Sequence, residues 1–154
     1  MPSIWTLNDL SDEIILKIST YLSMKDLICF SQVSQRIRII CQDMTIWKQV
    51  NMCGKKVPTI FIEKAIENGC QYISLANSRI NGRFCYLTKR SSLLKYLDLS
   101  NCDAAHDDVL EELIGSCHSL EKLSLGKLTL GLGLDMIQTI IENGQTLKVS
   151  IEND

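Results

Sequence analysis

The stretch LSDEIILKISTYL, residues 10–22, dominates the N-terminal part of the chain. Ser11 is a residue type preferred at a helix N-cap, and acidic residues follow it where negative charge stabilises a helix N-terminus. Leu16 falls on one side of this helix, and an apolar stripe falls on the other. The stripe consists of Ile14, Ile15, Ile18, Tyr21 and Leu22. The stretch therefore predicts a helix with more apolar surface than one small core can bury.

Two further short helices are expected downstream. Ser23 and Asp26 resemble a capping box and predict a helix from Met24 to about Ser31. A third helix is expected from about Ser34 to Gln42, with Ile39 outside its apolar stripe. That stripe consists of Val33, Ile37, Ile40, Cys41 and Met44.

Three helices in about 40 residues form only a marginal core, because units this small usually need staples or partners. Several apolar residues are left over after the stripes are assigned: Trp5, Leu7, Leu10, Leu16 and Ile39. This surplus indicates a protein interface. The alternative is that these side chains pack on the rest of the chain.

Residues 7–47 resemble an F-box. The matching positions are Leu10, Asp12, Glu13, Ile14, Ile15, Ile18, Leu22, Asp26, Leu27, Val33, Ser34, Arg36, Asp43 and Trp47. Two positions depart from the pattern: Ser11 stands where a proline is usual, and Ile37 where an aromatic residue is usual. Ser11 can still cap a helix, whereas Ile37 keeps the site apolar but has less area to pack.

The resemblance implies a partner. F-box segments dock on the S-phase-kinase-associated adaptor, which links them to a cullin scaffold and a RING ubiquitin ligase. The adaptor-binding residues carried over by position are Leu7, Leu10, Ser11, Ile14, Leu16, Leu22 and Leu27.

The rest of the chain has an internal period. The pattern L-x-x-L-x-L, or a close variant, recurs at intervals of 23 to 26 residues. The five segments are WKQVNM (47–52), CQYISL (70–75), LKYLDL (94–99), LEKLSL (120–125) and a last one containing Val149 and Ile151. This spacing is typical of leucine-rich repeats, each a strand plus a helix. It predicts five parallel strands.

The segments between the strands fit the same repeat. Cys102 occupies the Asn/Cys slot, with Ser78 and Leu128 at its equivalents, and the next apolar slot holds Val57, Ile80, Ala104 and Leu130. Helices are expected over about 59–67, 82–89, 106–114 and 134–142. Asn68-Gly69 and Asn143-Gly144 are signals of a helix C-terminus.

One face of the expected sheet carries polar and aromatic side chains. The outward positions are Lys48, Gln49, Asn51, Gln71, Tyr72, Ser74, Lys95, Tyr96, Asp98, Glu121, Lys122 and Ser124. We expect Tyr72 and Tyr96 to lie side by side. In F-box proteins with leucine-rich repeats, this face commonly binds the substrate protein. The resemblance therefore gives Asn51, Tyr72, Lys95, Tyr96, Asp98 and Lys122 as candidate substrate-binding residues.

Composition excludes several function classes. The 154 residues carry a net charge of -2 without a long Lys/Arg run, which argues against nucleic acid or an anionic membrane as the partner. No apolar run reaches the roughly 18 residues of a membrane span, and the N-terminus lacks the pattern of a signal peptide. The seven cysteines include no CxxC pair. Reduced thiols, and hence a cytoplasmic or nuclear location, are expected.

The cysteines and histidines do not form a recognisable reactive or metal site. Cys102 lies four residues before His106, and Cys117 adjoins His118. A zinc site is usually built from two closely spaced ligand pairs, which these are not. GLGLD (131–135) lacks the strand–helix context of a phosphate loop. We expect no enzyme activity, no catalytic residues, no metal and no cofactor.

The sequence thus predicts an α/β repeat fold: a three-helix F-box (5–47) followed by a short curved solenoid of about four leucine-rich repeats, the last incomplete (48–154). The expected function is substrate recognition in an SCF-type ubiquitin ligase, with the adaptor, cullin and RING subunits and a protein substrate as partners. The alternative is a non-catalytic scaffold, or a truncated F-box protein that binds the adaptor without recruiting substrate.

Overall fold

The computed structural model describes residues 3–85, 87, 93–126 and 148–150. The chain divides into two compact units, Met1–Ile46 and Trp47–Asp154, called here the helical unit and the sheet unit. Each is described by itself. Within the described residues, no helix has the length and apolar character needed to span a membrane.

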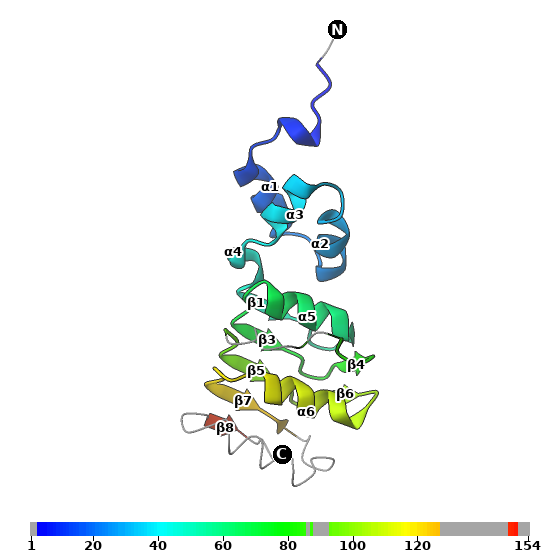
Figure 1. Ribbon diagram of the computed structural model, residues 1–154, viewed down its shortest axis with the longest axis vertical. Helices are drawn as coiled ribbons and strands as arrows, with labels where there is room; N and C mark the ends of the chain where they lie inside the picture. The colour runs from blue at the N-terminus through cyan, green and yellow to red at the C-terminus, as the bar shows by residue number, and fades with distance from the viewer. Residues whose placement is uncertain (1–2, 86, 88–92, 127–147, 151–154) are drawn as a thin grey trace. The chain divides into compact units, whose positions relative to one another are not determined.

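The helical unit contains the three predicted helices, preceded by a 3₁₀ turn (Figure 1). The elements are η1 (Leu7–Asp9), α1 (Asp12–Ser19), α2 (Met24–Phe30), α3 (Gln35–Cys41) and α4 (Met44–Trp47), whose last residue belongs to the sheet unit. Helix α3 packs against both α1 and α2. The core is small and consists of Ile15, Leu27, Ile37 and Cys41.

Serine residues begin the three main helices, but they do not all cap them in the same way. The Ser23 hydroxyl accepts a hydrogen bond from the Asp26 N–H (3.2 Å) and donates to the Asp26 carboxylate (2.6 Å). Ser34 accepts from the Ile37 N–H at 3.2 Å. Ser11 occupies the N-cap of α1 without a side-chain bond to the helix. Ser23 and Ser34 therefore stabilise their helices through side-chain hydrogen bonds, whereas Ser11 does so only through its backbone.

The buried face of α1 differs from the predicted stripe. Ile15 and Ser19 are buried, whereas Ile14, Ile18 and Tyr21 are exposed. The face that packs inward is rotated towards Ser19, whose hydroxyl donates to the Ile15 carbonyl (2.8 Å) and lies 3.8 Å from the Cys41 sulfur. Hydrogen bonding satisfies this buried hydroxyl, so a polar residue can sit in the core while isoleucines remain outside. The predicted stripe on α3 is also too wide, because Val33 and Met44 are exposed.

The sheet unit contains a five-stranded parallel sheet in the order β1-β3-β5-β7-β8. The strands are β1 (Gln49–Asn51), β3 (Tyr72–Ser74), β5 (Tyr96–Asp98), β7 (Lys122–Ser124) and β8 (Lys148–Ser150). Figure 1 shows them following one another down one side of the unit. The register pairs Val50 with Ile73, Ile73 with Leu97 and Leu97 with Leu123. These pairs join equivalent slots of the repeat, so the predicted strands and their order are confirmed.

A second parallel sheet runs beside the first, and the sequence did not predict it as a sheet. Its strands are β2 (Lys56–Pro58), β4 (Arg79–Asn81) and β6 (Asp103–Ala104). Val57 pairs with Ile80, and Ile80 with Ala104. These residues fill the apolar slot that follows each main strand, so the period of the repeat also sets the register of this sheet.

Two helices, α5 (Thr59–Glu67) and α6 (Asp107–Ser116), connect the strands, and both were predicted. Gly69, directly after the α5 C-cap, has the positive φ (81°) expected of a helix C-terminus. The predicted helix over 82–89 is wrong for residues 82–85, which are not helical. Here Thr59 of α5 donates to the Arg83 carbonyl (2.9 Å), and Glu63 accepts from the Cys85 N–H (2.6 Å). These two hydrogen bonds satisfy the Arg83 carbonyl and the Cys85 N–H, which are not part of a helix. The segments at 134–142 and 143–144 lie outside the described residues.

The core of the sheet unit is continuous along the repeats. Its fully buried side chains include Ile62, Ile73, Leu75, Ile80, Leu94, Leu97, Leu99, Leu113, Ile114 and Leu123. Val109 and Leu110 of α6 are buried as expected. The turn after β1 repeats after β3 and β5, because Gly54, Asn77 and Asn101 share one slot and all have positive φ (71°, 54° and 52°). Glycine and asparagine are the residues that adopt this conformation most readily.

Candidate protein-interaction sites

The segment before α1 is held by Arg36 of α3. The Arg36 Nη2 donates to the Leu10 carbonyl (2.7 Å), and its Nη1 donates to the Asn8 carbonyl (3.1 Å). Nη2 and Nε both bond to Asp12 Oδ1, at 2.6 and 2.9 Å. One guanidinium therefore positions η1 and the start of α1 on α3, which a single lysine ammonium could not match in geometry.

Two further local hydrogen bonds shape the same segment. The Asp9 carboxylate accepts from the Thr6 N–H (2.7 Å) and the Thr6 hydroxyl (2.8 Å). These bonds, the backbone one first, hold the pKa of Asp9 below its ordinary value of 3.8. The chain thus enters η1 in a defined turn.

The predicted adaptor-binding residues fall into three groups by exposure. Ser11 and Ile14 are exposed, while Leu7, Leu10, Leu16 and Leu22 are half-buried. Leu27 is only 3% exposed and belongs to the core of the helical unit. In this conformation Leu27 has almost no surface to offer a partner, so we leave it out of the contact set proposed below.

The structure adds residues that the sequence pattern assigned to the core. Ile14 and Ile18 on α1 and Tyr21 just after its C-cap are exposed apolar residues, called here the α1 stripe. Tyr21 is 77% exposed, and the Lys17 ammonium lies 5.6 Å from its ring centroid. Trp5, ahead of η1, is also exposed, as the surplus predicted. Nothing in the spacing distinguished this stripe from a core face, because both consist of apolar residues at helical intervals.

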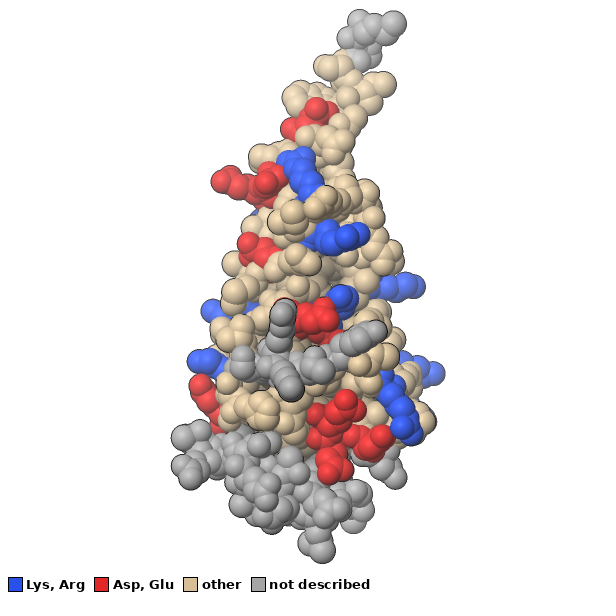
Figure 2. Space-filling view, in the orientation of Figure 1, with Lys and Arg blue, Asp and Glu red and all other residues tan. Residues whose placement is uncertain are grey.

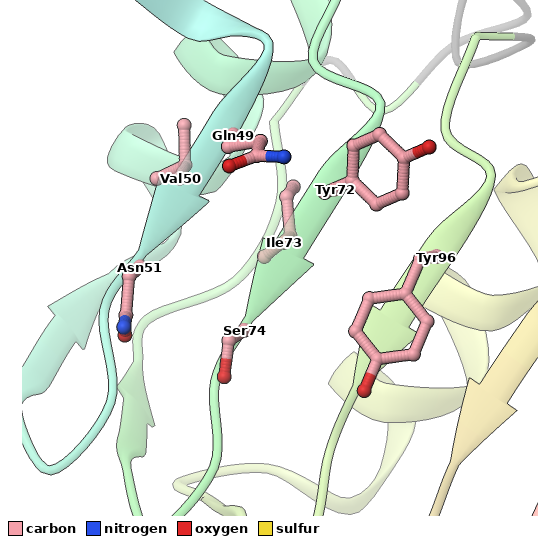
Figure 3. Close-up of a pocket in the computed structure, with 7 residues that line it drawn as sticks. All are labelled: Gln49, Val50, Asn51, Tyr72, Ile73, Ser74 and Tyr96. Carbon is pink, nitrogen blue, oxygen red and sulfur yellow. The ribbon is translucent and has the colours of Figure 1, made fainter.

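The second candidate site lies on the sheet unit. Gln49, Asn51, Tyr72, Ser74, Tyr96, Asp98 and Lys122 project from β1, β3, β5 and β7 and are called here the tyrosine face. Tyr72 and Tyr96 are register partners with ring centroids 6.4 Å apart and planes tilted by 43°. The prediction that they lie side by side is confirmed (Figure 3).

A shallow depression of about 380 Å³ opens on the tyrosine face. Its lining consists of Gln49, Val50, Asn51, Tyr72, Ile73, Ser74 and Tyr96 (Figure 3). Five of the lining side chains carry an amide or hydroxyl group. The depression is thus amphipathic, with aromatic rings on one side and hydrogen-bonding groups on the other.

Two candidates on this face also have structural roles. The Asn51 side-chain oxygen accepts from the Cys53 N–H (2.9 Å), and Asp98 Oδ1 accepts from the Ser100 N–H (2.9 Å). Both side chains therefore shape the turn that follows their strand. Lys95 forms an exposed ion pair with Glu121 at 3.4 Å. Ser124, expected to face outward, is buried, and its hydroxyl lies 2.9 Å from that of Ser100.

The buried thiols lack the character of nucleophiles. Burial raises the pKa of Cys70, Cys102 and Cys117 from 9.0 to about 11, and it also raises that of Cys41. A high pKa keeps a thiol protonated, and it is the thiolate that reacts or binds metal. Among the described residues, no group of three or more His, Cys, Asp or Glu side chains is arranged to hold a metal ion.

Comparison with known families identifies one domain. An F-box domain is detected at residues 7–49, and the match covers the helices of the helical unit. F-box domains generally bind the S-phase-kinase-associated adaptor of SCF ubiquitin ligases, and F-box proteins are generally non-catalytic. No curated protein matches the chain.

Proposed function

We propose that this chain is a substrate-recognition subunit of an SCF-type ubiquitin ligase. The F-box would bind the adaptor, and the sheet unit, a short leucine-rich-repeat array, would bind a protein substrate through the tyrosine face. The chain performs no bond chemistry in this role. It raises the local concentration of substrate near the ligase.

The F-box at residues 7–49 is the observation that carries this proposal. The exposed apolar surface of the same unit supports it. The α1 stripe and Trp5 expose side chains of a size that a small unit normally buries. A partner surface that covers them would recover the free energy of apolar burial, about 25 cal/mol for each Å² removed from water.

The proposed contact set combines both lines of reasoning. It contains Leu7, Leu10, Ser11, Ile14, Leu16 and Leu22 from the resemblance, and Ile18 and Tyr21 from the structure. Ile14 is the one α1-stripe residue that also belongs to the resemblance set. It is therefore the most informative position to change.

The test is a pull-down of the purified full chain with the adaptor, using the double variant Leu10→Ala, Ile14→Ala. We expect adaptor binding to fall at least about tenfold, since truncating a residue that is a hot spot of an interface costs about 2 kcal/mol or more. The matched control is Ile60→Ala on α5, because Ile60 is 46% exposed and Ile14 is 49% exposed. Unchanged adaptor binding by the folded double variant would refute the docking assignment.

Substrate recruitment needs a separate readout. Affinity purification from cells should yield the adaptor with the native chain, and a further protein that is lost from the Tyr72→Ala, Tyr96→Ala variant while the adaptor is retained. If the adaptor alone is recovered in both cases, the chain is instead a scaffold that occupies the adaptor without recruiting substrate.

A further inference from the structure

The tyrosine face has a single row of side chains that crosses four strands. Gln49, Tyr72, Tyr96 and Lys122 are register partners on β1, β3, β5 and β7. Neighbouring strands in a sheet lie about 4.8 Å apart, so these four side chains form a continuous line. The line offers an amide, two aromatic rings and an ammonium group in that order.

The rings of Tyr72 and Tyr96 lie together on the tyrosine face. Tyr72 is 38% exposed, and Tyr96 is half-buried beside it. Both rings line the depression, and Figure 3 shows them side by side on neighbouring strands. Tyrosine provides a large amphipathic contact area at a low cost in side-chain entropy, which makes it frequent in protein-binding surfaces.

The ammonium group of Lys122 follows the two rings in the row, and the register continues from Lys122 to Lys148 of β8. Lys122 Nζ lies 5.3 Å from the Tyr96 ring centroid. Among the residues that the structure describes, no carboxylate forms an ion pair with Lys122. Its charge thus lies beside the ring in a weak cation–π contact.

The acidic groups nearby are already engaged. Glu121 pairs with Lys95, and Asp98 accepts from the Ser100 N–H. The Lys95 pair is long and exposed, and such pairs contribute little, so a stronger acceptor could draw Lys95 away. Asp98 keeps its negative charge, but it belongs to the neighbouring register row with Ser74 and Ser124. Among Gln49, Tyr72, Tyr96 and Lys122, the charged side chain is that of Lys122, so this row favours an anionic partner over a cationic one.

The remaining polar groups suit an extended chain. Within the described part of the protein, the side chains of Gln49 and Ser74 make no hydrogen bond, and both line the depression. An amide and a hydroxyl beside two rings can bond to the backbone of a peptide that crosses the strands. A compact ion would leave the aromatic surface uncovered.

We propose that the tyrosine face binds an extended acidic peptide segment. A carboxylate of that segment pairs with Lys122, and an adjacent planar side chain packs on Tyr72 and Tyr96. This rests on the proposed function only in taking the segment to be part of the recruited protein.

The test measures fluorescence anisotropy of a labelled peptide, Gly-Glu-Glu-Tyr-Glu-Glu-Gly, added to the purified full chain. Three comparison peptides replace every Glu by Gln, every Glu by Lys, or the Tyr by Ala. We expect the Glu peptide to bind at least about fivefold more tightly than the Gln peptide, as one charge-assisted contact would give. The Lys peptide should not bind, and the Ala peptide should bind more weakly.

Protein variants test the individual contacts. Lys122→Gln should reduce binding of the Glu peptide about fivefold, with little effect on binding of the Gln peptide, and Lys122→Arg should retain most of the affinity. Tyr72→Ala should weaken the binding of both peptides. The matched control is Lys56→Gln on β2, an exposed lysine on the other sheet, which should leave binding unchanged.

The possible failures are distinguishable. Equal binding of the Glu and Gln peptides, tighter binding of the Lys peptide, or the same affinity for Lys122→Gln would overturn the acidic-segment assignment. Self-association that Tyr72→Ala abolishes, measured by sedimentation, would make a second copy of the chain the occupant instead and also overturn it. Adaptor binding is measured on the same samples: its loss with peptide binding retained would contradict the ligase role and leave this inference standing.

Discussion

The two units of this chain treat apolar side chains in opposite ways. Of the described residues, the helical unit buries four hydrophobic side chains and exposes eight large ones, whereas the sheet unit buries twenty-four and exposes three. Repeats that stack on one another extend a shared core, so most apolar positions find an internal partner. A bundle of three short helices does not repeat, so its core cannot be extended in this way.

This difference separates stability from binding. The sheet unit can be weakened by core substitutions, while its tyrosine face lies on the surface of the sheet. In the helical unit, the exposed side chains proposed to contact a partner are apolar, as are those that form its core. The following experiments test that separation, from the largest expected effect to the smallest.

Leu97→Ala should have the largest effect. Leu97 is fully buried at the centre of β5, and truncating such a leucine costs about 2–5 kcal/mol because a cavity remains. The measurement is urea unfolding followed by tryptophan fluorescence. The chain has two tryptophans, of which Trp47 is buried in the sheet unit and Trp5 is already exposed, so the change reports mainly the sheet unit.

Leu93→Ala is the matched control, since Leu93 is exposed and lies four residues earlier. It should change the free energy of unfolding by no more than about 0.5 kcal/mol. Equal losses from both variants would show that burial along the repeats does not determine the stability of this unit.

Ser23→Ala should have an intermediate effect, confined to the helical unit. It removes the bond that Ser23 accepts from the Asp26 N–H, and loss of such a cap costs about 1 kcal/mol. Ser11→Ala should cost much less, because Ser11 makes no side-chain cap bond. Far-ultraviolet circular dichroism during thermal unfolding compares the two. A larger loss from Ser11→Ala would contradict the capping geometry described here.

The smallest expected effect concerns the buried thiols, and it appears only at alkaline pH. Cys70, Cys102 and Cys117 of the sheet unit have pKa values raised from 9.0 to about 11 by burial. In the unfolded chain these thiols ionise first. Their contribution to stability is therefore complete below pH 9.0 and is lost as the pH rises from 9.0 to about 11.

Urea unfolding at several pH values, again followed through Trp47, measures this loss. Cys102→Ala should make the decline with pH shallower than in the native chain. At pH 8, iodoacetamide should modify the exposed Cys29, Cys53 and Cys85 and spare the four buried thiols. A free energy of unfolding that is constant across the window would contradict the assignment.

Most of the sheet unit could be predicted from its period. Placing Tyr72 opposite Tyr96 required only that equivalent positions of a repeat pair with one another. The segment at 82–85 could not be predicted in the same way. This segment donates a hydrogen bond to Glu63 and accepts one from Thr59, and both residues lie over twenty residues earlier in the chain.

The candidate sites were predictable to different degrees. The tyrosine face follows from strand alternation, which assigns every second side chain to one side of a sheet. The α1 stripe does not follow from helical periodicity, because apolar residues surround most of that helix. Only packing against α3 assigned Ile15 to the core and left Ile14 exposed.

The sequence by itself determined the helices α1, α2, α3, α5 and α6, the order and register of the main strands, and the F-box match at residues 7–49. These features depend on the spacing of residue types along the chain. Tertiary structure alone decided which face of α1 is buried, how Arg36 holds the segment before it, and that Lys122 lies beside Tyr96 without an acidic partner among the described residues. Such features depend on contacts between distant residues, and no local spacing encodes them.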